Sequence, residues 1–124
     1  MKALGDIGES AVCEYLCFEG YAILARNFRI RGGEIDIIAE KDGVIAFVEC
    51  KARTSDSPCF GAETLTEAQK KRIAKTAAEY CLRTKNKLQP RFDIAEVDLD
   101  LNGVPIRINY IENAYDVTDM DIFF

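Results

Sequence analysis

The chain has 124 residues, 48% of them hydrophobic and 30% charged, which fits one domain with a substantial core and excludes wholesale disorder. It contains no His, which excludes Ser-His-Asp catalysis, Cys-His catalysis and His-based zinc sites. No stretch approaches the ~18 apolar residues of a membrane span, and the N-terminus lacks the apolar segment of a secretory signal. We therefore expect a single cytoplasmic domain over residues 1–124, with no membrane partner.

The net charge of −5 is distributed unevenly along the chain. Residues 93–124 hold eight acidic residues and one base, whereas residues 69–91 hold eight bases and one acid. A basic segment of this kind is either a solvated helix face or a contact surface for nucleic acid. Charge alone leaves both interpretations open. The acidic C-terminal hairpin is not expected to face nucleic acid.

Apolar periodicity predicts two amphipathic helices and five strands. The helices are expected over residues 5–19 and 64–83, and the strands over 21–30, 33–41, 44–53, 91–101 and 104–112. Asp42-Gly43 and Asn102-Gly103 are hairpin signals between apolar runs. This order predicts an α/β fold in which helices flank a mixed five-stranded sheet.

Local signals refine two of these elements. Thr64 and Glu67 fit a capping box at the start of the second helix. In the fourth strand the apolar alternation slips between Ile94 and Val97, which indicates either a bulge or a strand buried on both faces.

The hairpin around Asp42-Gly43 gathers charged side chains. A two-residue turn places Asp36 opposite Glu49 and Glu34 opposite Lys51, and strand alternation puts all four on one face. The other face is an apolar core face, made by Ile35, Ile37, Ala39, Ala46, Val48 and Cys50. Two facing carboxylates repel, so a sheet keeps them only with compensation. Mg²⁺ or Mn²⁺ suits such oxygen ligands; the alternative is a solvated face with an ordinary Glu34–Lys51 pair.

Each helix also carries a polar residue on its inner side. Glu9 precedes Val12 by three residues and Leu16 by seven, and Gln69 precedes Ile73 by four. Both are therefore expected to face inward near a helix start. For Glu9 the alternative is a first-turn acid that the helix dipole stabilises.

This combination resembles the PD-(D/E)xK nuclease core of restriction-endonuclease-like folds. The segments that carry the resemblance are Glu9, Arg26-Asn27-x-Arg29, GEIDIIA at 33–39, FVECKAR at 47–53, Gln69-Lys70-Lys71-Arg72 and Arg91-Phe92-Asp93. Within this superfamily the chain resembles the YraN-type family of small bacterial proteins, which is similar to archaeal Holliday-junction resolvases. Two departures are the Gly-Glu-Ile before Asp36, where many nucleases have Pro, and Cys50, where an aliphatic residue is common.

The resemblance implies metal-dependent hydrolysis of nucleic-acid phosphodiesters, with DNA as the expected substrate, including branched or repair intermediates. Asp36, Glu49 and the main-chain carbonyl of Cys50 would bind Mg²⁺ or Mn²⁺. Glu9 would be a further ligand, directly or through water. The ion would lower the pKa of its water and stabilise the attacking and leaving oxygens.

The resemblance also assigns roles to residues around the metal. Lys51 would orient or deprotonate the attacking water, and Gln69 would support the site from the second helix. Seven bases are candidate phosphate contacts: Arg26, Arg29, Arg31, Arg53, Lys70, Lys71 and Arg72. Resolvases of this class are commonly dimers, so a homodimer is a further expectation.

Two other function classes stay open. One is a nucleic-acid-binding module with the same fold and no turnover, since fold does not imply function. The other is an interaction domain that uses its acidic C-terminal face.

Overall fold

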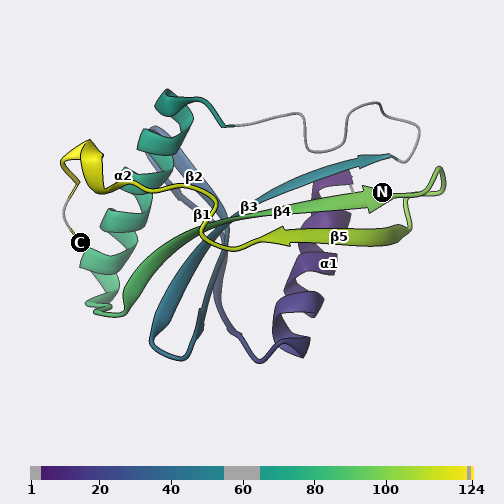
Figure 1. Ribbon diagram of the computed structural model, residues 1–124, viewed down its shortest axis with the longest axis horizontal. Coiled ribbons are helices and arrows are strands. Elements are labelled where there is room, and N and C mark those ends of the chain that lie inside the picture. Colours follow the sequence, from purple (N-terminus) through teal and green to yellow (C-terminus); the bar gives the residue numbers. More distant parts are fainter. Residues whose placement is uncertain (1–3, 55–64, 123) are drawn as a thin grey trace.

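The protein folds as one mixed sheet with a helix packed against each face (Figure 1). The computed structural model describes residues 4–54, 65–122 and 124. The helices are α1 (Leu4–Phe18), α2 (Glu67–Thr84) and the short 3-10 helix η1 (Thr118–Met120). The strands are β1 (Ala22–Ile30), β2 (Gly33–Lys41), β3 (Val44–Thr54), β4 (Gln89–Leu99) and β5 (Pro105–Ile111). This order confirms the predicted α/β fold with its mixed five-stranded sheet.

The strands lie side by side in their sequence order. Neighbouring strands are antiparallel, except that β3 and β4, which α2 connects, are parallel. Asp42 and Gly43 have φ values of 50° and 81°, as a tight hairpin turn requires. The β2–β3 register, which runs from Lys41↔Val44 to Ile37↔Val48, is the one that a two-residue turn predicts.

Each helix buries its apolar side against one face of the sheet. On one face, Val12 and Leu16 of α1 pack on β2, β3 and β4. On the other face, Ile73, Ala77 and Tyr80 of α2 pack on the same three strands. Within the described part of the chain, neither helix is long and apolar enough to cross a lipid bilayer.

Two glycines bring both helices close to one end of the sheet. A Cβ on Gly8 of α1 would lie 2.8 Å from the Cβ of Ala52 on β3. A Cβ on Gly33, at the start of β2, would lie 1.9 Å from Oγ1 of Thr76 on α2. Both contacts are closer than a side chain tolerates, so these glycines set the spacing of the helices around the region where β2 begins and β3 ends.

The start of α2 differs from the prediction. Thr66 is the N-cap: its Oγ1 accepts the Gln69 N–H at 3.1 Å, and the Gln69 Oε1 accepts the Thr66 N–H at 2.7 Å. Glu67 is the first helical residue, so the predicted box of Thr64 and Glu67 is wrong, and Thr64 itself lies outside the described residues. The same motif recurs two residues later in the sequence, and that copy caps the helix.

β4 resolves the alternative that its sequence left open. Val97 packs against α1, and Ile94 packs on the α2 side, so the strand is buried on both faces. Its register shift lies between Asp98 and Leu99 rather than between Ile94 and Val97. The slip in apolar alternation therefore reflects burial on both faces and not a bulge at that point.

Candidate active site

β2 and β3 separate at Asp36, and we call this point the fork. The ladder between the two strands ends at Ile37↔Val48, one residue before Asp36 and Glu49 would pair. From there β2 continues beside β1, and β3 continues beside β4. The backbone N–H of Cys50, beyond the last ladder pair, donates to Oδ2 of Asp36 at 2.8 Å. The Asp36 carboxylate therefore bridges the two strands where their backbone pairing stops.

The fork coincides with a break in the alternation of β2. Ile37 packs against α1, but Ile35 packs against α2. The prediction that the two share one face of the sheet is therefore wrong. On β1, Arg26 and Phe28 pair with Ile37 and Ile35, and Asn27 between them has a left-handed φ of 52°. A left-handed residue inside a strand locally rotates the backbone. Simple alternation therefore fails for Ile35.

Asp36 and Glu49, which we call the carboxyl pair, share a hydrogen bond and are half-buried. Burial is the main cause that raises the pKa of each, and the pKa of Glu49 reaches about 7. The charge of Asp36 also raises the Glu49 pKa, and the charge of Lys51 partly offsets this. Buried carboxylates that face one another are protonated more readily for these reasons.

Glu9 reaches the fork from α1. It is only 8% exposed, and its charge contributes to the raised pKa of Asp36. Its Oε1 accepts a hydrogen bond from Nδ2 of Asn27 at 3.1 Å and lies 3.7 Å from the guanidinium of Arg26. Glu9 is thus buried on the inner side of α1 and acts on Asp36 through its charge. The structure adds Asn27, whose one sequence signal was its known tolerance of left-handed backbone.

Lys51 lies on β3 two residues after Glu49 and pairs in register with Glu96 of β4. Glu96 is 6% exposed and accepts a hydrogen bond from Asn109 at 2.8 Å. Glu34 forms an ion pair with Arg29, so the predicted pairing of Glu34 with Lys51 is wrong. The β2–β3 ladder ends before these two residues would meet. The acidic strand β4 therefore supplies the neighbour of Lys51.

A small cavity of about 160 Å³ opens beside the fork. It lies between the start of β2, β3 and the first turns of α2, and its lining includes Glu34, Glu49, Gln69 and Arg72. Gln69 thus stands near Glu49 as predicted, with its side-chain oxygen engaged in the cap of α2. The cavity gives Glu49 a polar, accessible side.

The other predicted phosphate contacts surround this cavity or lie farther along the sheet. Arg26, Arg29 and Arg31 belong to β1 and the turn after it, and Lys70, Lys71 and Arg72 to the first turns of α2. Lys70 forms an ion pair with Glu67 at 3.3 Å, and Arg53 stands in register with Asp98. Arg72 lines the cavity from α2, and Arg29 of β1 forms an ion pair with Glu34 of its lining.

The donor set fits a hard divalent cation. Over residues 4–54 and 65–122, no three His, Cys, Asp or Glu side chains converge closely enough to form a complete metal cage. Mg²⁺ keeps several waters and is commonly held by one or two carboxylates, so a complete cage is not required. The carboxyl pair supplies oxygen ligands of this kind.

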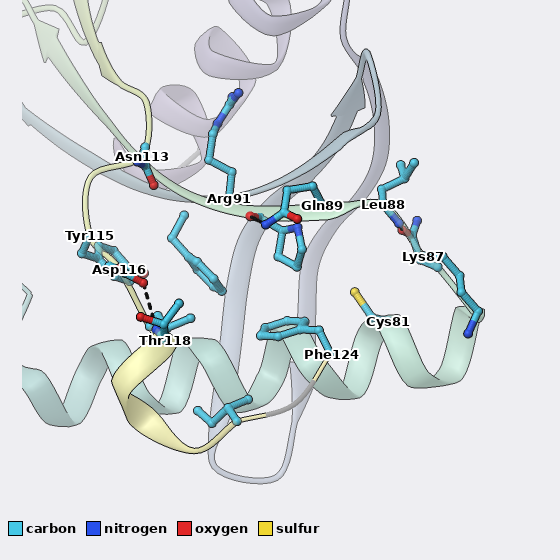
Figure 2. Close-up of a pocket in the computed structure, with 15 residues that line it drawn as sticks. Cys81, Lys87, Leu88, Gln89, Arg91, Asn113, Tyr115, Asp116, Thr118 and Phe124 are labelled. Atoms are coloured by element: carbon cyan, nitrogen blue, oxygen red, sulfur yellow. Dashed lines mark hydrogen bonds between the residues drawn. The ribbon is translucent and has the colours of Figure 1, made fainter.

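A larger cavity, about 590 Å³, lies between β4, α2 and the C-terminal segment (Figure 2). Figure 2 shows Phe124 and Cys81 beside one another over α2, and a hydrogen bond between Asp116 and Thr118. Its one charged residue from β4, Arg91, is bound to Asp93 on the other face of the sheet. The carboxyl pair does not line this cavity. Size alone therefore does not identify the site.

The family model described as "Uncharacterised protein family UPF0102" matches residues 8–97. The chain is 40% identical over 115 residues to a UPF0102 protein of Symbiobacterium thermophilum, which covers 92% of this chain and 97% of that protein. It is 41% identical over 120 residues to one of Trichlorobacter lovleyi, with 94% and 92% covered. A third, from Clostridium perfringens, is 38% identical over 118 residues, with 94% and 96% covered. The matched region contains the carboxyl pair, Glu9 and Lys51.

Proposed function

The chain belongs to the UPF0102 family, the YraN-type family that its motifs resemble, and on this premise we propose that it is a metal-dependent nuclease. The proposed substrate is the phosphodiester backbone of nucleic acid in the cytoplasm, most readily DNA, including branched or repair intermediates. The observation that carries the proposal is the carboxyl pair. The fold places two acids together at the fork, where burial raises the pKa of each and the charge of Asp36 raises that of Glu49 as well.

In this proposal Asp36 and Glu49 hold Mg²⁺ or Mn²⁺, with the Cys50 carbonyl and Glu9 as further ligands. When bound, the ion supplies positive charge that lowers the pKa of a water and stabilises the oxygens at phosphorus. Lys51, two residues beyond Glu49, orients the attacking water and neutralises charge that develops on the phosphate.

The basic residues around the small cavity hold the substrate. Arg26 stands beside Glu9, and Arg72 lines the cavity that Glu49 shares. Contacts from such side chains to phosphates fix the position of a nucleic acid without reading its sequence. We therefore expect binding that weakens with salt and depends on the shape of the substrate more than on its bases.

A cleavage assay tests the proposal. Labelled linear duplex, single-stranded, flap and four-way-junction DNA would be offered with Mg²⁺ or Mn²⁺, beside an RNA of matched sequence and an EDTA control. We expect metal-dependent cleavage that Asp36→Asn lowers by roughly 10³-fold or more, about 4 kcal/mol of transition-state stabilisation. Glu49→Ala should act in the same way.

Asp42→Asn is the matched control, because it makes the same chemical change in the exposed hairpin turn, where Asn tolerates the left-handed backbone. It should cleave like the wild type. Cleavage that survives Asp36→Asn, or no cleavage of any substrate by the wild type, would overturn the proposal. Binding without cleavage would instead support a nucleic-acid-binding module.

A further inference from the structure

Asn27 has a backbone conformation that a strand does not require. It lies inside β1, and its φ of 52° is left-handed. Asparagine is one of the few residues other than glycine that enter this region readily. Such outliers persist only where the surrounding structure holds them, and they are frequent at functional sites.

The side chain of Asn27 holds a buried acid. Its Nδ2 donates to Oε1 of Glu9 at 3.1 Å, across 18 positions of sequence and from β1 to α1. Glu9 is 8% exposed. The second donor that the structure records near Glu9, the guanidinium of Arg26, is also directed at Oε1, at 3.7 Å. Both recorded contacts are therefore with the same oxygen of the carboxylate.

The position of Asn27 links this contact to the fork. Asn27 lies between Arg26 and Phe28, which pair with Ile37 and Ile35 on either side of Asp36, where the alternation of β2 breaks. Its amide thus holds Glu9, an acid whose charge raises the pKa of Asp36. We propose that Asn27 is a positioning residue of the site, which orients Glu9 toward the cation that Asp36 binds. This inference rests on the proposed function only through the bound cation.

The chemistry of the contact explains why asparagine is needed. Glycine would allow the same backbone but has no donor for Glu9. Aspartate would tolerate the left-handed backbone, but it would present an acceptor and a negative charge to an acid. Asn27→Gly therefore removes the amide with the least backbone strain, and Asn27→Asp reverses the contact.

Direct binding of Mn²⁺ tests the proposal without any substrate. Titration calorimetry, or the electron paramagnetic resonance signal of free Mn²⁺, would compare the wild type, Asn27→Gly, Glu9→Gln and the double variant. Outer partners of metal ligands typically change metal affinity by about 10–100-fold, so we expect that loss in Asn27→Gly. The double variant should bind no more weakly than Glu9→Gln, because the amide acts through Glu9.

Asn113→Gly is the matched control. Asn113 also has a left-handed φ, 51°, and glycine retains the backbone N–H that it donates to Asp93. This variant should bind Mn²⁺ like the wild type. Thermal unfolding in EDTA would establish that each variant folds. If Asn27→Gly does not fold, Asn27→Asp takes its place, with at least about tenfold weaker binding expected.

The outcomes separate this inference from the proposed function. Equal Mn²⁺ affinity of the wild type and the Asn27 variant, or losses that add to those of Glu9→Gln, would overturn the role of Asn27 alone. A wild type that binds Mn²⁺ but cleaves nothing would overturn the nuclease proposal and leave the Asn27 comparison valid. A wild type that binds no Mn²⁺ would overturn both.

Discussion

Asp93 and the carboxyl pair lie close to one another in the sheet, and their carboxylates have different kinds of partner. Asp93 of β4 is in register with Val48, the residue before Glu49, and belongs to the α1 face. It is fully buried and accepts hydrogen bonds from the Arg91 guanidinium at 2.8 Å, the Tyr110 hydroxyl at 2.6 Å and the Asn113 N–H at 2.9 Å. The fold itself thus supplies a counter-charge and two further donors to this acid.

The carboxyl pair has different neighbours. Asp36 accepts from the Cys50 N–H, but burial raises its pKa, and the nearby charges of Glu9 and Glu34 add to this. An acid whose donors come from its own fold has a structural role. Acids that crowd one another, as Asp36 and Glu49 do, leave room for a positive charge from outside the chain. Arg91-Phe92-Asp93, one of the segments that carry the family resemblance, therefore has a structural role, because its Arg and Asp bind one another.

Removing the structural acid should have the largest effect on stability. Asp93→Ala would leave the Arg91 guanidinium, 19% exposed, and the Tyr110 hydroxyl without their acceptor. Breaking a buried ion pair from one side costs about 3–5 kcal/mol. Urea unfolding would measure this loss in the free energy of unfolding. A loss below about 1 kcal/mol, the size of a surface pair, would contradict the structural role.

The carboxyl pair should instead show itself in the pH dependence of stability. The pKa of Glu49 is about 7 in the folded chain, against an ordinary value of 4.5. Between these values the folded state holds a proton that the unfolded state has released. The free energy of unfolding of the metal-free protein should therefore fall as pH rises from 4.5 to 7, by about 2 kcal/mol.

Urea unfolding in EDTA between pH 4.5 and 8 would measure this slope. Glu49→Gln should flatten it, because the variant has no proton to lose at that position. Saturating Mg²⁺ at pH 8 should restore stability to the wild type, since a cation replaces the proton. Identical pH profiles for the wild type and Glu49→Gln would mean that the carboxyl pair is not crowded in solution.

Asp36→Asn should change metal-free stability by about 1 kcal/mol or less at pH 8, in contrast to Asp93→Ala. The substitution relieves repulsion with Glu49 and weakens the hydrogen bond from Cys50, and these effects oppose one another. Thermal unfolding in EDTA would measure the difference. A loss as large as that of Asp93→Ala would place Asp36 among the structural acids, and the loss of cleavage in this variant would then reflect unfolding.

The sequence predicts the parts of the site that follow from local rules. Asp42-Gly43 fixes a two-residue turn, and this sets the register that aligns Asp36 with Glu49. The inward position of Glu9 follows from helical spacing, because the contacts of α1 repeat its apolar period. The order of helices and strands likewise follows from apolar periodicity and turn signals.

The rest depends on tertiary contacts that no local pattern contains. Alternation rules assume a continuous ladder, so they miss the fork at Asp36 and place Ile35 on the wrong face. The Asn27–Glu9 contact needs β1 and α1 to be placed in space first. The sequence contains two overlapping capping-box motifs, Thr64 with Glu67 and Thr66 with Gln69. No local signal ranks one above the other, so the sequence does not predict that Thr66 is the N-cap.

Substitution of Gln69 should have the smallest effect on stability and cleavage. It tests whether Gln69 is a structural residue, like Asp93, or acts on the site, like the carboxyl pair. Gln69 lines the small cavity near Glu49, but its Oε1 accepts the Thr66 N–H at 2.7 Å and completes the capping box. If its part is to fix the first turn of α2, Gln69→Ala should lower the free energy of unfolding by about 1 kcal/mol. Cleavage should then stay within about threefold of the wild type, less than 1 kcal/mol of activation free energy.

Gln69→Glu separates the two roles, because glutamate completes a capping box as well as glutamine does but adds a charge beside Glu49. Stability should match the wild type in this variant if the cap is what matters. A large loss of cleavage in Gln69→Ala without loss of stability would instead group Gln69 with Asp36. The amide would then act on the carboxyl pair directly, and the capping hydrogen bond would only hold it in place. Urea unfolding and the cleavage assay, run on the same two variants, decide whether Gln69 stabilises the first turn of α2 or acts directly on the carboxyl pair.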